Sequence, residues 1–65
     1  MIVRINGKES EVPQKLTIAD IVRERNLPDR VIIDLNGEIL NPERWSSTYL
    51  RSDDDLELVQ VIGGG

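Results

Sequence analysis

The sequence opens with a period-two pattern of apolar and polar positions. Over residues 1–5 (MIVRI) every second side chain is apolar, which is typical of a strand with one buried face. Asn6-Gly7 is a strong signal for a tight hairpin turn, so a second strand is predicted over residues 8–12. Pro13 cannot donate a ladder hydrogen bond, and we expect it to end that strand.

The pattern then changes to the three-to-four spacing of a helix. Thr17 is placed as an N-cap, and Asp20 follows three residues later as a variant of the capping box. Ile18 and Ile21 fall on one face, which predicts that this face is buried. We expect the helix to end near Asn26, just before a proline.

The second half of the chain predicts another hairpin. Residues 31–35 are rich in β-branched side chains, Asn36-Gly37 supplies a turn, and residues 39–40 are an apolar pair. Asn41 is placed to cap a loop or single helical turn that follows. Trp45 is expected to pack as a plug against the sheet.

A polar turn over residues 52–55 leads into the last predicted strand, residues 56–62. The order of elements favours an α+β fold in which one mixed sheet packs on one main helix, the β-grasp architecture. We predict one β-grasp domain over residues 1–62 and a flexible C-terminal glycine tail over residues 63–65.

Composition narrows the functional classes. The 65 residues include no cysteine and no histidine, so this chain lacks a thiol nucleophile and the side chain best suited to proton transfer near neutral pH. We therefore predict that it is not an enzyme and has no catalytic residue. Asp53, Asp54 and Asp55 lack the alternate spacing of a calcium loop, and no metal site is predicted.

Charge and hydropathy indicate which partners the protein binds and in which compartment it is found. Twelve acidic and eight basic residues give a net charge of −4, which argues against nucleic acid as a partner. The same charge favours docking on a partner protein with a basic surface, although solubility alone would explain it equally well. The sequence shows neither a secretory signal nor a stretch of membrane-spanning length. We expect a cytoplasmic monomer that does not bind a membrane.

The glycine tail is the feature that carries chemistry. Nothing follows Gly65, so the glycines cannot form a phosphate-binding loop, which must lead into a helix. An extended segment such as Gly63-Gly64 can thread a channel too narrow for any Cβ and deliver the carboxylate of Gly65 to a partner's active site. On composition alone, a frayed terminus or an expression scar explains the tail equally well.

Strand parity predicts where such a partner would dock. Val59 and Val61 have the parity opposite to Leu56 and Leu58, so if the leucines face the helix, the valines face outward. Gln60 has inward parity, which indicates that the strand leaves the core before it. We predict an apolar docking patch near the start of the tail, although scattered surface aliphatic residues are also ordinary; its members are Ile2, Ile32, Val59 and Val61.

In their order along the chain, these features resemble the ThiS family, the ubiquitin-like β-grasp sulfur carriers of thiamine biosynthesis. The resemblance covers the whole length and rests on Asn6-Gly7, the Thr17-led helix, Asn36-Gly37-Glu38-Ile39, Pro42-x-x-Trp45, the acidic turn and Val61-Ile62-Gly63-Gly64-Gly65. The chain departs from the family at Asp54, where a glycine between two acids is usual. Because aspartate tolerates a left-handed backbone, we expect the turn to be preserved.

The resemblance implies a cycle that other proteins catalyse. An E1-like adenylating enzyme of the ThiF type, using ATP and Mg²⁺, would adenylate the Gly65 carboxylate, and sulfur derived from a persulfide would displace AMP. The thiocarboxylate would then pass to a thiazole synthase of the ThiG type. Gly65 would be the covalent site, Gly63 and Gly64 the threading segment, and the chain itself would bind no cofactor.

Three alternatives remain open on the sequence. The small subunit of molybdopterin synthase is similar in fold, tail and activation, but that family usually has a longer chain with phenylalanine before its tail, and phenylalanine is absent here. A non-covalent interaction module would use the sheet and leave the glycines idle. A ubiquitin-like modifier attached to lysines would use the same activated terminus.

Overall fold

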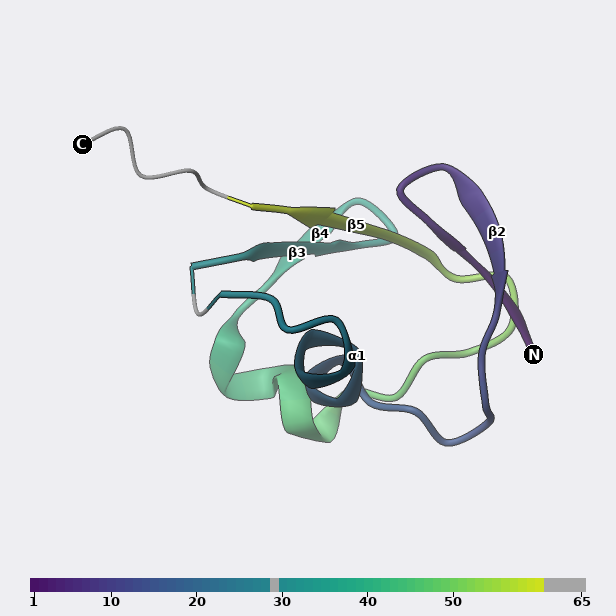
Figure 1. Ribbon diagram of the computed structural model, residues 1–65, viewed down its shortest axis with the longest axis horizontal. Coiled ribbons are helices and arrows are strands. Elements are labelled where there is room, and N and C mark those ends of the chain that lie inside the picture. Colours follow the sequence, from purple (N-terminus) through teal and green to yellow (C-terminus); the bar gives the residue numbers. More distant parts are fainter. Residues whose placement is uncertain (29, 61–65) are drawn as a thin grey trace.

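The computed structural model describes residues 1–28 and 30–60, and these residues form one mixed β-sheet with helices on one side (Figure 1). The elements in chain order are β1 (Ile2–Ile5), β2 (Lys8–Glu11), α1 (Ile18–Glu24), β3 (Ile32–Leu35), β4 (Glu38–Leu40), the 3₁₀ helix η1 (Pro42–Ser47) and β5 (Asp55–Val59). The predicted covalent site, threading segment and outermost docking residue lie outside the described residues: Gly65, Gly63, Gly64 and Val61.

The sheet has the strand order β2-β1-β5-β3-β4. Only β1 and β5 pair in parallel, with Arg4 opposite Asp55; the other neighbouring pairs are antiparallel. β5, the last strand of the described residues, therefore lies at the centre of the sheet, between the two hairpins, and α1 covers one face (Figure 1). This arrangement confirms the predicted ubiquitin-like β-grasp fold.

Both Asn-Gly pairs form the turns that the sequence predicted. Asn6 and Gly7 have φ values of 50° and 82°, and Asn36 and Gly37 have values of 54° and 91°. Positive φ at both central positions is the geometry of a type I′ turn, whose twist matches that of the flanking strands. Asparagine and glycine are the residues that adopt it at the lowest cost, so the two turns fix the register of β1–β2 and β3–β4.

The predicted capping box is present at the start of α1. The Asp20 backbone N–H donates to Thr17 Oγ1 (3.1 Å), and the Thr17 backbone N–H donates to Asp20 Oδ2 (3.0 Å). Hydrogen bonds from the Thr17 backbone and then from its side chain, with a smaller contribution from Arg23, hold the pKa of Asp20 below its usual value of 3.8. Local chemistry therefore sets where this seven-residue helix begins.

The helix also ends for a local reason. Asn26 adopts a left-handed φ of 52° just after the last helical turn. The Leu27 N–H donates to the Val22 carbonyl (3.0 Å), and the Asn26 N–H donates to the Arg23 carbonyl (3.1 Å). These two bonds make a Schellman motif, which satisfies carbonyls that the helix leaves without partners. The predicted end near Asn26 is confirmed.

The core lies between α1 and the covered face of the sheet. Its buried apolar residues are Val3, Ile5, Leu16, Ile18, Ile21, Val31, Ile33, Leu50 and Leu56. Trp45 is half-buried against this cluster, as predicted, and its Nε1–H donates to the Leu40 carbonyl (3.3 Å). Because indole carries one donor, this bond lets the ring cover the core without leaving a buried polar atom unpaired.

Candidate functional site

The described part of the chain ends where β5 leaves the sheet. β5 runs from Asp55 to Val59, so it begins one residue earlier than predicted. Gln60 is exposed and lies beyond the strand, which agrees with the inward parity that indicated an early departure from the core. The sequence places the predicted covalent site, Gly65, five residues after Gln60. Any surface that guides those residues must therefore lie near the end of β5.

An apolar pair stands at this end of the sheet. Ile32 in β3 and Val59 in β5 are cross-strand partners on the face opposite α1, with 39% and 48% of their surfaces exposed. Ile39 in β4 pairs with Asp34 on the same face and is 69% exposed, one diagonal step from Ile32. We call Ile32, Ile39 and Val59 the outer patch. Ile39 is not among the predicted docking residues, although its parity, opposite to that of the half-buried Leu40, carries the signal.

Ile2 is not part of this patch. It is exposed on the same face, but it pairs with Glu11 in the edge strand β2, and its carbonyl accepts from the Asp53 N–H (2.8 Å). Asp53 precedes Val59 by six residues, and six steps of about 3.3 Å separate the two positions by roughly 20 Å. The prediction that Ile2 lies near the start of the tail is therefore wrong. The parallel register of β1 and β5 places it at the other end of the sheet.

An open hollow of about 510 Å³ adjoins the outer patch. Ile32 and Ile39 line it together with Leu40 and Pro42, and Arg30 contributes a cationic side chain. The hollow lies beside the three-residue edge strand β4, where main-chain groups are open to a partner. The apolar surface at this end of the sheet therefore extends from β5 across β3 to the sheet edge.

Acidic side chains occupy the middle of the same open face. Asp34 and Glu57 lie directly opposite each other in the β3–β5 ladder, between the Ile32–Val59 pair and Asp55, and Asp34 also lies beside Ile39 of the outer patch. Asp55 in turn lies opposite Arg4, and Arg4 lies opposite Glu9. The open face thus changes from apolar at the end of β5 to predominantly acidic at its beginning.

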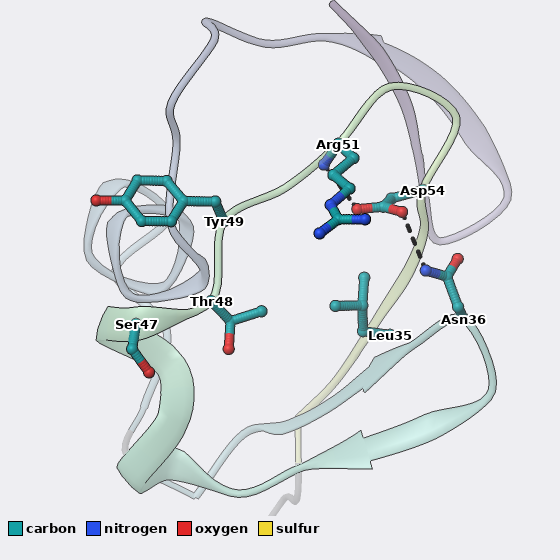
Figure 2. Close-up of a pocket in the computed structure, with 7 residues that line it drawn as sticks. All are labelled: Leu35, Asn36, Ser47, Thr48, Tyr49, Arg51 and Asp54. Carbon is teal, nitrogen blue, oxygen red and sulfur yellow. Dashed lines mark hydrogen bonds between the residues drawn. The ribbon is translucent and has the colours of Figure 1, made fainter.

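A second hollow, of about 390 Å³, lies between the β3–β4 turn and the loop before β5 (Figure 2). Asp54 Oδ1 accepts from Asn36 Nδ2 (3.0 Å), and Asp54 Oδ2 accepts from the Arg51 N–H (2.7 Å). Asn36 Oδ1 accepts from the Asp55 N–H (2.9 Å). The Asn36 amide and Asp54 Oδ1 hold the loop to the hairpin, and Asp54 Oδ2 closes the loop on itself, so these polar groups serve the fold.

The turn before β5 corrects one expectation. The residue with a left-handed backbone is Asp53, with φ 69°, and not Asp54. Asp54 instead contributes its carboxylate, which bonds to the β3–β4 turn and to the start of its own loop. The turn is preserved, and the Asp54 side chain stabilises it.

The described ranges contain no group of three acidic residues placed to hold a metal ion. Within the same residues, no helix is long and apolar enough to cross a membrane.

Comparison with known proteins agrees with this geometry. The model of the ThiS family matches residues 2–65. The sulfur carrier protein ThiS of Bacillus subtilis (strain 168) is 32% identical over 66 residues, covering 98% of this chain and 100% of that protein. An uncharacterized protein, ycf40, of Pyropia yezoensis is 28% identical over 64 residues, covering 97% of this chain and 90% of that protein.

Comparison with solved structures agrees with the family match. The crystal structure of the thiamine biosynthesis protein ThiS from Geobacter metallireducens aligns with a TM-score of 0.83 and 29% sequence identity, over 100% of both chains. The family resemblance seen in the sequence is thereby confirmed, since the family match spans all but the first residue. The chain belongs to the ThiS family.

Proposed function

We propose that this chain carries sulfur as a thiocarboxylate on the terminal carboxyl group of Gly65, for use in thiamine biosynthesis. The observation that supports this most strongly is that the family match continues to residue 65. The glycine tail then belongs to the family pattern, which weighs against a frayed end or an expression scar. The chain acts as a carrier in the cytoplasm, and partner enzymes perform the chemistry.

The chemistry begins with activation, because a carboxylate is a poor electrophile. An E1-like adenylating enzyme of the ThiF type, with ATP and Mg²⁺, joins a Gly65 carboxylate oxygen to the α-phosphate and releases pyrophosphate. A persulfide sulfur then attacks the acyl carbon, and AMP leaves with its electron pair. A thiol reduces the resulting S–S bond and frees the thiocarboxylate, whose sulfur is the better nucleophile for a thiazole synthase of the ThiG type.

In this scheme the folded domain is the part that the partner enzyme binds, and it positions the tail. Five residues span at most roughly 17 Å when extended, so the domain must dock within that distance of the active site. Gly63 and Gly64 lack a Cβ and pass through a channel that larger residues would block. Ile32 and Val59, joined by Ile39, supply the apolar contact beside the start of this segment, and Val61 stays a predicted contact.

The proposal is tested by intact-mass measurement. The full chain is incubated with its cognate adenylating enzyme, ATP, Mg²⁺ and a persulfide donor. Exchange of one oxygen for sulfur adds about 16 Da. Subsequent addition of the thiazole synthase with its other substrates should return the mass to its original value. If the large subunit of a molybdopterin synthase removes the sulfur and the thiazole synthase does not, the thiamine assignment is wrong.

The matched control carries one alanine after Gly65. Residues 1–60 keep all their contacts, so we expect this variant to unfold at the same temperature as the parent chain and to gain no mass. A mass gain in the extended variant that maps to a residue other than the added alanine would show that the sulfur is not carried on the terminal carboxyl group, and the proposal would be abandoned.

A further inference from the structure

The open face of the sheet holds two like charges in direct opposition. Asp34 and Glu57 are cross-strand partners, and their Cα register places both carboxylates on the face away from α1. Like charges opposite each other destabilise a sheet. Within residues 1–28 and 30–60, no lysine or arginine nitrogen lies within 4.0 Å of either carboxylate. The described fold therefore contains nothing that offsets this repulsion by a direct ion pair.

The fold accounts for one of the two acids but not for the other. Asp34 Oδ1 accepts from the Gly37 N–H (2.9 Å), which anchors the tight turn between β3 and β4. Glu57 is exposed, and across the described ranges its side chain makes no hydrogen bond. Glu57 therefore destabilises the sheet by its repulsion of Asp34, and its side chain makes no described contact that stabilises the fold.

A partner that covers the outer patch must also contact Asp34 and Glu57. Glu57 and Asp34 each lie two residues from Val59 and Ile32 in their strands, a separation of about 7 Å. A carboxylate covered by an apolar surface loses its hydration and is strongly destabilised unless a cation replaces the water. A protein that packs on Ile32 and Val59 therefore needs a lysine or arginine over Glu57.

We propose that Glu57, together with Asp34, is the charged half of the docking face, and that it receives a lysine or arginine from the activating enzyme. This inference rests on the proposed function. An enzyme that brings a carboxylate together with ATP must neutralise both anions, so the surroundings of its active site are positive. The net charge of −4 and the acidic middle of the open face complement such a surface, while the outer patch fixes the position of the tail.

The test compares charge variants in direct binding to the adenylating enzyme. Glu57→Lys should raise the dissociation constant at least about tenfold. Glu57→Gln should raise it less, and most of the dependence of its affinity on salt concentration should be lost. Glu24→Lys is the control, because it makes the same change of charge at the exposed end of α1, on the covered side of the sheet. We expect its dissociation constant to stay within about twofold of the parent value.

Stability separates recognition from folding in this experiment. Removing one of two opposed carboxylates relieves repulsion, so both Glu57 variants should unfold at or above the temperature of the parent chain. If Glu57→Lys binds as tightly as the parent chain, or if Glu24→Lys weakens binding equally, the inference is overturned. It is also overturned if the parent chain does not bind the enzyme.

The outcomes distinguish this inference from the proposed function. A parent chain that gains sulfur while Glu57→Lys binds normally overturns the inference and leaves the carrier role intact. A parent chain that binds in a Glu57-dependent way but gains no sulfur supports the docking face and contradicts the carrier role.

Discussion

Val59, the last residue of β5, lies opposite Ile32 in β3, and both side chains face away from α1. This pair stands where the described chain leaves the sheet, and Val59 precedes Gly65 by six residues. A partner that binds this pair fixes the position of the folded domain, and the length of the tail then limits how far the terminal carboxyl group can reach. The geometry therefore assigns positioning to the sheet and reaction to the tail.

The first prediction concerns the outer patch. Val59→Asp should reduce the affinity for the activating enzyme by roughly tenfold or more, because it removes apolar contact and adds a charge to a covered surface. Ile2→Asp is the matched control, since Ile2 is an exposed residue on the same face at the other end of the sheet. Isothermal titration calorimetry measures both. Equal losses in the two variants would show that docking is not confined to the end of β5.

The second prediction separates two neighbouring aspartates. Asp54→Gly removes two side-chain hydrogen bonds, to Asn36 and to the Arg51 N–H, and should lower the free energy of unfolding by about 1–2 kcal/mol. Asp53→Gly should change it by less than about 1 kcal/mol, because glycine adopts the left-handed backbone of residue 53 without strain. Urea unfolding of both variants checks this. A larger loss for Asp53→Gly would contradict the assignment of these roles.

The third prediction is a pH dependence. The pKa of Asp20 is lowered in the folded chain, chiefly by Thr17, so its carboxylate stabilises the fold at pH values above the usual 3.8. This contribution is lost as the pH falls through the lower folded value. Asp20→Asn should be less stable than the parent chain near pH 6, and the difference should shrink below about pH 4. A difference that stays constant from pH 6 to pH 3 in urea unfolding would rule out this linkage.

The sequence was sufficient wherever the cause was local. Asn-Gly pairs demand positive φ, and Thr17 with Asp20 forms a capping box, so the hairpins and the helix start followed from a few adjacent residues. The fold class followed because these elements leave few ways to bury one apolar face against one helix.

The arrangement of the docking face depends on contacts that no local pattern carries. Parity placed Ile2 and Val59 on one face, but only the parallel register of β1 and β5 shows that they lie at opposite ends. The opposition of Asp34 and Glu57 likewise arises from a pairing between residues far apart in the chain. Ile39 carries the same parity signal, but its strand of three residues is too short to establish an alternating pattern.

The most direct test of the central claim locates the transferred sulfur within the chain. After reaction with the adenylating enzyme, ATP and a persulfide donor, the product is fragmented and the mass of each fragment is compared with that of the untreated chain. We predict a gain of about 16 Da in the fragments that contain the carboxyl group of Gly65, and in no others. A gain that maps to any other residue, or unchanged C-terminal fragments, would contradict the account.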